Sequence, residues 1–515
     1  MPKLTDYSTY ADAQKHFSRE KLWELFDGSA ENFNIAHECV DRHADTGREA
    51  VIVIHTDGHE EIIGYGQLAA DSARFAGFLR AQGVCAGDRI AIMLDPSRAF
   101  YAAVFGALKA GAIVVPLFTL FGPDGVRLRV QDCSPVLLVT NPEKADGAPS
   151  IGGLKVVVFD DALFAAMQKF SATFVPATRA DGMAVLQYTS GTTRELPEAV
   201  KHRHRTLVTL MLAALYGTGL RPTDRFMCPS SPAWGHGLWH GTFAPMALGL
   251  TVGSYSGKFD PKRLLQALEA HAFTNLSAAA THYRMMRNSG CASNHRYALK
   301  KLSFTGEPID PDTAKFARDT FGHAVCSMYG TTELGVVLVN YPGATDFIVK
   351  PGALGKPTPG GRVEVQDESG APCPAGIVGH LMVHRHDKWV PTRDLARTDV
   401  DGYFYHAGRA DDVIISAGWT MSAVEIENAI LAHPDVRDVA AIGVADELRG
   451  QVVKAFVISE RRGGDDFASE IQQLVKSRLS QHEYPRHIAF VSALPKTPAG
   501  KLNRKKLRES EQQGT

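Results

Sequence analysis

Short apolar runs alternate with amphipathic stretches from Asp88 onward, and this alternation limits the fold more than any other feature of the chain. The runs predict strands at 89–94, 112–117, 136–140, 155–159 and 275–279. The stretches beside them predict helices at 100–108, 161–170, 261–270 and 311–320. Apolar runs of this length, separated by helices, are typical of a parallel sheet covered on both faces. The sequence therefore predicts a large N-terminal domain of parallel α/β layers.

The pattern changes twice toward the C-terminus. After Pro351 the chain is rich in Gly and Pro, and its alternating strands at 362–366 and 378–383 predict a small, bent, β-barrel-like antiparallel unit. From Asp412 strands are expected at 413–416, 439–444, 453–459 and 487–492, with helices at 422–432 and 467–480. This α+β pattern could fold alone, and 515 residues exceed what one core usually serves. We predict two domains, 1–410 and 411–515.

Composition excludes several classes of partner. The 55 Lys+Arg balance 56 Asp+Glu, so no field of one sign indicates nucleic acid. The most apolar run, 110–121, contains Gly111 and Pro116 and is too short to span a membrane. Seven scattered cysteines without a C-x-x-C pair favour a reducing compartment over a zinc or disulfide framework. The N-terminus has no apolar core of a signal peptide. We expect a cytoplasmic protein with no nucleic-acid or membrane partner.

Four short motifs follow one another along the chain. They read Y-T-S-G-T-T at 188–193, M-Y-G-T-T-E at 328–333, G-R-A-D-D-V-I-I-S-A-G at 408–418 and P-K-T-P-A-G-K at 495–501. In this order and at these separations they resemble the adenylate-forming superfamily, which includes acyl-CoA synthetases, amino-acid adenylation domains and firefly-type luciferases. The resemblance covers about residues 50 to 508. It implies a smaller, mobile C-terminal domain and the site residues that follow.

The first motif is a loop of small hydroxyl residues and a glycine, whose backbone N–H groups can converge on an anion. By resemblance this loop holds the phosphates of ATP through Thr189, Ser190, Gly191, Thr192 and Thr193. The continuation departs from the superfamily, because it has gained a residue and carries Glu198 where a lysine is usual. Arg194 could supply the missing positive charge, since a guanidinium binds phosphate oxygens in bidentate fashion.

The second motif supplies the base and metal contacts that the resemblance implies. Tyr329 would stack on adenine, Thr332 would contact phosphate and Glu333 would ligate Mg²⁺. An aromatic face, a hydroxyl and a hard oxygen suit these three tasks. The remaining nucleotide-binding candidates lie in this motif and in S-F-T-G-E-P, and they are Gly306, Glu307, Pro308, Gly330 and Thr331.

The ribose, hinge and CoA residues come from the later motifs. Asp394, in P-T-R-D where T-G-D is usual, would accept both ribose hydroxyls, and Arg409 would lie beside the ribose. Asp411 matches the hinge about which the C-terminal domain rotates between two half-reactions. Lys501 would neutralise the charge that develops during adenylation. The backbone of S-A-G-W would line the CoA channel, with Ser416, Ala417, Gly418 and Trp419.

The acyl pocket is expected around P-A-W-G-H-G-L-W-H-G, which precedes a predicted helix at 242–250. His236 falls where amino-acid adenylating domains carry an aspartate for the substrate ammonium, so an α-amino acid would leave its charge unpaired. Gly330 falls where acetate-specific synthetases carry a tryptophan, so a larger acyl group is expected. The predicted acyl-binding residues are Trp234, His236, Gly237, Thr281 and Gly330.

Together these features predict an AMP-forming acyl-CoA synthetase that uses ATP, Mg²⁺ and coenzyme A. The acid is expected to be branched, medium-chain or aromatic, and the sequence does not decide between a monomer and a homodimer. One alternative is an adenylate-former with another acceptor, a carrier protein or oxygen. A second alternative, motivated by Glu198 and by Arg194–Glu195, is a catalytically weak nucleotide- or acyl-binding homologue.

Overall fold

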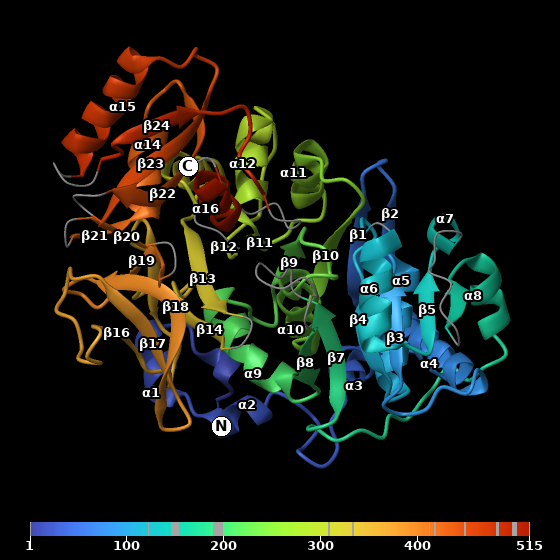
Figure 1. The fold of residues 1–515 in the computed structure, drawn as a ribbon. Coiled ribbons are helices and arrows are strands. Elements are labelled where there is room, and N and C mark those ends of the chain that lie inside the picture. Colours follow the sequence, from blue (N-terminus) through green and yellow to red (C-terminus); the bar gives the residue numbers. More distant parts are fainter. Residues whose placement is uncertain are drawn as a thin grey trace. The chain divides into compact units, whose positions relative to one another are not determined.

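The computed structural model describes most of the chain as two compact units (Figure 1). The described residues up to Gly361 form the first unit, and those from Arg362 form the second. The structure describes residues 2–121, 123–145, 154–188, 199–306, 309–331, 334–410, 413–416, 419–446, 450–479, 484–496 and 502–513.

The first unit contains a sheet in the order β6-β5-β3-β4-β7-β8. The strands are β3 (Arg89–Met93), β4 (Ile113–Pro116), β5 (Leu137–Thr140), β6 (Lys155–Val158), β7 (Met183–Tyr188) and β8 (Ala199–Arg203), all parallel except β8. Successive residues of β3 face opposite ways. Ile90 and Ile92 join the core that includes α4 (Tyr65–Ala81) and α5 (Arg98–Lys109), whereas Ala91 and Met93 join the core of α6 (Pro123–Cys133). The predicted coverage of both faces is confirmed.

A second sheet of this unit has the order β15-β14-β13-β12-β11-β9-β10-β1-β2. Its bounds are β1 (Glu49–His55), β2 (Glu60–Gly64), β9 (Arg225–Cys228), β10 (Thr251–Ser256), β11 (Asn275–Ala278), β12 (Lys301–Phe304), β13 (Val325–Thr331), β14 (Gly335–Val339) and β15 (Ala353–Pro357). The strands from β1 to β13 in this order run parallel, while β2, β14 and β15 pair antiparallel at the two ends.

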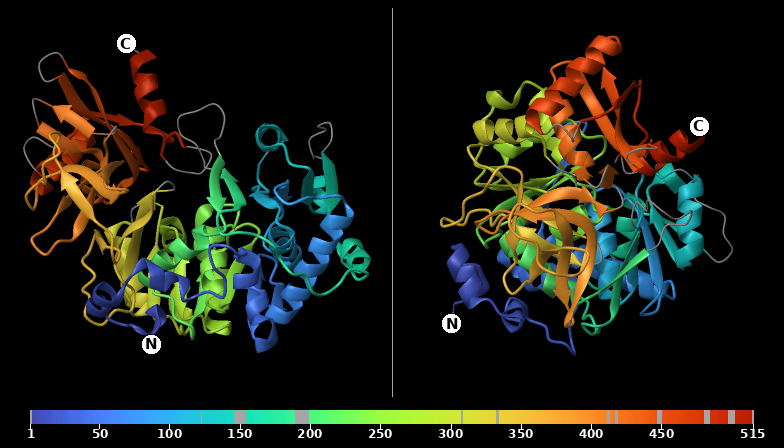
Figure 2. Two further views of the ribbon diagram at one scale, coloured as in Figure 1. Left: turned by 90° about the horizontal axis from the view of Figure 1, so that it is seen from below. Right: turned by 60° about the vertical axis from the view of Figure 1, so that its left-hand side comes forward.

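Helices cover the second sheet on both faces. On one face lie α11 (Pro261–Ala270), α12 (Ala280–Asn288) and α13 (Pro311–Phe321), which share a core with Ile52, Met227 and Leu302. The other face shares one core with the first sheet, through Val51, Phe226 and Val252. Figure 2 shows the two sheets and their helices side by side within this unit. The helices of the shared core include α3 (Ile35–Cys39), α9 (Thr206–Leu212), η3 (Ala213–Gly217), η4 (His236–Phe243) and α10 (Ala244–Ala247).

Shorter helical segments complete the first unit. They are η1 (Leu4–Asp6), α1 (Tyr10–His16), α2 (Arg19–Trp23), η2 (Asp41–Thr46), α7 (Pro142–Ala145), α8 (Asp161–Met167) and η5 (Ala292–Asn294). Across the described part of the chain, no helix combines the length and apolar character that crossing a membrane requires.

The second unit begins with antiparallel strands in the order β16-β17-β18-β19. Their bounds are β16 (Val363–Gln366), β17 (Gly379–Arg385), β18 (Lys388–Thr398) and β19 (Phe404–Arg409). The hairpin β20 (Val413–Ser416) and β21 (Trp419–Ser422) follows, then the sheet β22-β23-β24. That sheet is formed by β22 (Val436–Asp446), β23 (Gly450–Ser459) and β24 (His487–Phe490).

Helices lie on both faces of the β22-β23-β24 sheet. Ala441 and Val457 share a core with α14 (Ala423–Leu431) and α15 (Asp465–Arg478), and Ala440 and Phe456 share one with Leu507 of α16 (Arg504–Gln513). The predicted α+β unit after the N-terminal α/β layers is therefore confirmed. The predicted boundary at 410–411 is the point about which the C-terminal domain would rotate between the two half-reactions. This boundary stays a prediction.

Candidate active site

Several predicted nucleotide and acyl residues that the structure describes in the first unit lie where parallel strands end. The chain leaves β9 toward His236, β11 toward Thr281, β12 toward Gly306, and β13 ends with Tyr329 to Thr331. These strands are parallel, so their carboxyl ends share one edge of the sheet. Ligands of open α/β sheets bind outside this edge. The fold thus brings together segments, from His236 to Thr331, that are far apart in the sequence.

Two of these segments are joined directly. β12 and β13 pair in parallel with Phe304 opposite Ser327, and the Thr305 hydroxyl donates to the carbonyl oxygen of Met328 at 2.9 Å. Gly306 therefore lies beside the start of the Tyr329 segment, as the two motifs predict. Their roles toward ATP stay predictions.

Gly330 lies at a close approach between β13 and β14. The register shifts between Tyr329 and Gly330, and a Cβ at position 330 would lie 2.1 Å from the carbonyl oxygen of Gly335. Such a contact requires the backbone to move. The glycine at 330 is thus explained by the hairpin itself, and its link to acyl length stays a prediction.

His236 is held between two serines in the predicted acyl segment. Its Nδ1 lies 2.9 Å from Ser230 Oγ, and its Nε2 lies 2.9 Å from Ser277 Oγ of β11. Burial, followed by the charges of His240 and His282, lowers the pKa of His236 to about 3. The ring is therefore neutral at pH 7, with one nitrogen donating and the other accepting. A neutral, satisfied ring offers no counter-charge for an ammonium group.

The helix that begins at His236 is η4, a π-helix, and it begins six residues before the predicted start at 242. Gly237 makes this possible because a Cβ there would lie 2.3 Å from the carbonyl oxygens of Ser230 and Ser231. The predicted helix at 242–250 is wrong in its bounds, since α10 ends at Ala247. π turns carry no 3.6-residue period and frequently mark functional sites.

Gln187 is a site residue that the sequence analysis missed. Trp239 Nε1 donates to Gln187 Oε1 at 2.9 Å, and Gln187 Nε2 donates to the carbonyl oxygen of Ala233 at 3.2 Å. Gln187 is buried on β7, the strand that leads into the predicted phosphate loop. It therefore fixes the acyl segment to this strand. The available signal was a polar residue within the apolar run Met183–Tyr188.

Aromatic rings surround the same segment. The Trp234 ring centroid lies 5.5 Å from that of Phe118 and 6.4 Å from that of Phe121, and the Arg129 guanidinium lies 3.8 Å from the Phe121 centroid. On the other side, the His202 ring lies 4.7 Å from Trp239. Apolar and aromatic walls with a few fixed polar groups suit a small-molecule acyl group.

Thr281 lies in the first turn of α12, directly after the carboxyl end of β11, and is exposed. The neighbouring Ala280 is fully buried. The position of Thr281 at the shared edge agrees with the predicted pocket, while its contact with an acyl group stays a prediction.

In the second unit the two predicted ribose residues are cross-strand partners. Asp394 of β18 lies opposite Arg409 of β19, and His406 Nε2 lies 3.7 Å from Asp394 Oδ1. Arg393, which replaces the usual glycine, has a φ of +66°, in the left-handed region that glycine occupies at no steric cost. The local backbone thus keeps a glycine-like conformation although the residue has changed.

The CoA and lysine motifs are described only in part. Ser416 and Trp419 are register partners at the tip of the β20–β21 hairpin. Lys496 and Leu502, which flank the segment 497–501 in the sequence, form an antiparallel bridge. The predicted site residues outside the described residues are Thr189, Ser190, Gly191, Thr192, Thr193, Arg194, Glu307, Pro308, Thr332, Glu333, Asp411, Ala417, Gly418 and Lys501.

An open cavity of about 690 Å³ lies elsewhere in the first unit. It is lined by Glu49, Arg225 and Thr251, the first residues of β1, β9 and β10. These are amino ends of parallel strands, whereas the motif residues follow carboxyl ends. The volume of this cavity is therefore no evidence that it is the active site.

Comparison with known proteins agrees with this geometry. The family model for AMP-binding enzymes matches residues 40–388, and that for the AMP-binding enzyme C-terminal domain matches residues 425–501. The acetyl-coenzyme A synthetase of Bacillus subtilis (strain 168) is 29% identical, with 97% of this chain and 94% of the relative covered.

Two solved structures have the same fold over nearly their full lengths. An acyl-CoA synthetase from Brucella canis has 30% identity and a TM-score of 0.76, covering 99% of this chain and 100% of that one. ATP-bound MatB from Rhodopseudomonas palustris has 26% identity and a TM-score of 0.80, covering 93% and 99%.

The fold and these comparisons define an acid–thiol ligase of the adenylate-forming class. Since the family match covers more than half of its 515 residues, the protein belongs to the AMP-binding enzyme family.

Proposed function

We propose that the protein is an AMP-forming acyl-CoA synthetase, an acid–thiol ligase. In the first step a carboxylate oxygen attacks the α-phosphorus of ATP, and pyrophosphate leaves. In the second step the CoA sulfur attacks the acyl carbon, a C–S bond forms, the bond to AMP breaks and the thiol proton is released. The net reaction converts acid, ATP and CoA to acyl-CoA, AMP and pyrophosphate.

The observation that carries this proposal is that the two family matches, at 40–388 and 425–501, include the acyl segment, the motifs at 188–193 and 328–333 and the C-terminal motif at 495–501. The relative with 97% coverage is itself named acetyl-coenzyme A synthetase. A second acceptor chemistry has no comparable support among these relatives.

Roles for individual residues follow from the motifs and remain part of the proposal. Glu333 would hold Mg²⁺, which supplies charge neutralisation for the phosphates, and Arg194 would replace the usual lysine of the phosphate loop. Lys501 would act in the adenylation step alone, and Asp411 would be the hinge. Ser416 to Trp419 would line the path of CoA.

The acid is proposed to be uncharged beyond its carboxylate and larger than acetate. His236 is neutral at pH 7, with both ring nitrogens placed on serines, so it offers no charge to an amino acid. The rings of Trp234 and Phe118 favour a branched, medium-chain or aromatic acyl group. The seven cysteines are all free, which supports a reducing compartment such as the cytoplasm.

A panel of acids tests the proposal. Acetate, isobutyrate, hexanoate, benzoate and glycine are each supplied with Mg-ATP, with and without CoA. AMP, pyrophosphate and thioester are measured, together with the exchange of labelled pyrophosphate into ATP. We expect equal amounts of the three products with at least one larger acid, and thioester only with CoA. Acid-dependent pyrophosphate exchange without thioester would favour another acceptor. No exchange with any acid would favour a catalytically weak binding protein.

A further inference from the structure

Two histidines and a glutamate gather at the hairpin that joins β1 and β2. The backbone N–H of His55 donates to the carbonyl oxygen of His59 at 3.0 Å, so these residues face each other across the turn. Glu61 lies two residues beyond His59 and pairs with Val53, two residues before His55. Side chains alternate along a strand, so His55, His59 and Glu61 share one face.

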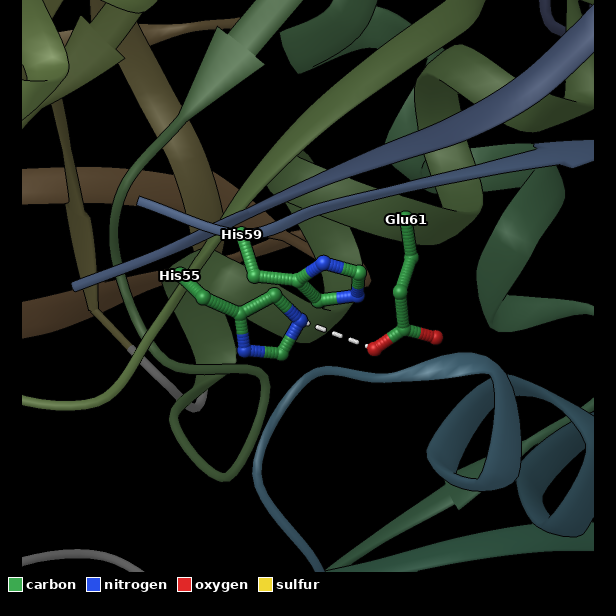
Figure 3. A group of neighbouring side chains, drawn as sticks. All are labelled: His55, His59 and Glu61. Atoms are coloured by element: carbon green, nitrogen blue, oxygen red, sulfur yellow. Dashed lines mark hydrogen bonds and ion pairs between the residues drawn. The ribbon is translucent and has the colours of Figure 1, made fainter. Parts of the chain in front are cut away.

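The three side chains point toward one another, as Figure 3 shows. His55 Nε2 lies 2.8 Å from Glu61 Oε1, and the two imidazole centroids are 5.3 Å apart. One ligand atom from each residue lies within 4.8 Å of the others, and among the described residues this is the single group of three such donors. Ligand atoms at 2.0–2.2 Å from a tetrahedral Zn²⁺ are about 3.4 Å apart from one another. Modest side-chain rotations would therefore bring the three donor atoms to this spacing.

The surroundings hold the cluster in place. The second carboxylate oxygen of Glu61 accepts from the backbone N–H of Arg98, at the start of α5, at 2.9 Å. Asp57 caps the turn by accepting from the N–H of His59 at 2.9 Å, and Arg263 donates to the carbonyl oxygen of Gly58 at 3.0 Å. A carboxylate that is bonded on its other oxygen is oriented for a metal, as outer partners of metal ligands usually are.

Charge near the cluster also favours a cation. Glu61 supplies the one carboxylate of the cluster, with the His55 ring on one oxygen and the backbone N–H of Arg98 on the other. The nearby Arg98 guanidinium is neutralised by Asp71, with contacts of 2.7 and 3.1 Å. His59 is exposed, which leaves a side of the cluster open to water.

We propose that His55, His59 and Glu61 form a binding site for a divalent transition metal of the Zn²⁺ class, with water in the remaining position. Two imidazoles and one carboxylate suit Zn²⁺ or Co²⁺, whereas Mg²⁺ takes oxygen ligands. None of the three residues is among those predicted to bind ATP or its Mg²⁺. Bound metal would connect both strands of the hairpin and thereby stabilise the sheet edge formed by β1 and β2.

Calorimetric titration of the chelator-treated full chain with Zn²⁺ tests the site. We compare the wild type with His59→Ala, which alters an exposed side chain, and with His323→Ala, a control at another exposed histidine. The wild type and His323→Ala should each bind one equivalent of Zn²⁺ with the same affinity. His59→Ala should bind this Zn²⁺ at least tenfold more weakly. Glu61→Gln, which keeps the shape but removes the charge, should weaken binding as well.

Two further readouts sharpen the test. Co²⁺ should give a visible absorption band in the wild type that is lost in His59→Ala. Saturating Zn²⁺ should raise the Tm of the wild type and leave that of His59→Ala unchanged, because a ligand stabilises only the state that binds it. Equal Zn²⁺ affinity and stoichiometry in the wild type and His59→Ala would overturn the proposal and indicate adventitious binding elsewhere.

Discussion

At position 330 the backbone of the β13–β14 hairpin, rather than the size of the acyl group, accounts for the residue type. The sequence suggests that Gly330→Trp would narrow the pocket toward small acids. A side chain at this position would first collide with the Gly335 carbonyl oxygen, 2.1 Å from its Cβ. Any substitution at position 330 is therefore expected to change the conformation of the hairpin first, and to change substrate preference only as a consequence.

Gly330→Ala should lower the free energy of unfolding by about 1–3 kcal/mol, the usual range for overpacking. It should also reduce kcat/KM for short and long acids by similar factors, because the whole hairpin moves. Urea denaturation and rates with two acids check this. Gly464→Ala is the control, since its Cβ would meet nothing within 4 Å. A loss of kcat/KM for long acids alone would instead indicate that Gly330 lines the acyl pocket.

His204 gives the stability of the protein a defined pH dependence. Its side chain is fully buried, Nδ1 accepts from the Ile35 N–H at 3.2 Å, and Nε2 has no hydrogen-bond partner among the described residues. Burial lowers the pKa of His204 to about 4 from 6.5. Between these values the unfolded chain binds the proton and the folded chain does not, so stability is lost as the pH falls from 6.5 toward 4.

The contribution of His204 to the slope of the unfolding free energy against pH should reach about 1.4 kcal/mol per pH unit. His204→Asn keeps an acceptor near the Nδ1 position but cannot titrate, so its unfolding free energy should fall less steeply between pH 7 and pH 5. Urea denaturation at several pH values measures the two slopes. Equal slopes would show that His204 is not held neutral in the folded protein.

At the scale of elements, the sequence predicts best where local and tertiary signals agree. The predicted helix at 261–270 matches α11, because Asp260 caps Lys262 and Pro261 occupies the first turn. Buried parallel strands such as β3 and β5 were found from their apolar runs. The π turns of η4 were not, since they depend on the close packing of Gly237 against Ser230 and Ser231. Packing of this kind leaves no periodic pattern of hydrophobic residues in the local sequence.

The Gln187–Trp239 hydrogen bond is an element-scale tie between β7 and η4. Trp239→Phe removes the donor and leaves a buried amide oxygen unsatisfied, which typically costs about 1–3 kcal/mol. We expect that loss of stability together with a raised KM for the acid, because the acyl segment loosens. Gln187→Leu should do the same.

A double-mutant cycle separates this tie from simple packing. The double variant should be less destabilised than the sum of the two single variants, since both partners of one bond are then gone. Denaturation of the four proteins gives the coupling. Strict additivity would mean that the two side chains act independently.

At the scale of the whole molecule, the motifs predict which distant segments form one site, and the fold places several of them at the carboxyl ends of neighbouring parallel strands. Tyr329 and Gly306 are assigned to one site because both of their segments resemble nucleotide-site motifs of the adenylate-forming superfamily. The division into units could not be predicted, since β16–β19 join the C-terminal unit through tertiary packing. Within that unit Arg397 of β18 lies 3.9 Å from Glu425 of α14. The change of pattern after Pro351 predicts a separate antiparallel unit, but the contacts that join this unit to the C-terminal part have no local signal in the sequence.

The two-step account predicts that Lys501 serves one half-reaction only. Lys501→Ala should lower acid-dependent pyrophosphate exchange by at least a hundredfold, because an electrostatic donor to developing charge is worth about 3 kcal/mol. Thioester formation from a supplied acyl-adenylate should be largely intact. Lys505→Ala, at an exposed position on α16, is the control. Equal losses in both half-reactions would contradict a role confined to adenylation.

The acyl-adenylate itself can be tested by following oxygen. An acid labelled with ¹⁸O in both carboxylate positions is incubated with the protein, Mg-ATP and CoA, and the products are analysed by mass spectrometry. Attack of the carboxylate on the α-phosphorus leaves one labelled oxygen in AMP and none in pyrophosphate. The account predicts this distribution. Unlabelled AMP, or label in inorganic phosphate with ADP as the nucleotide product, would contradict it.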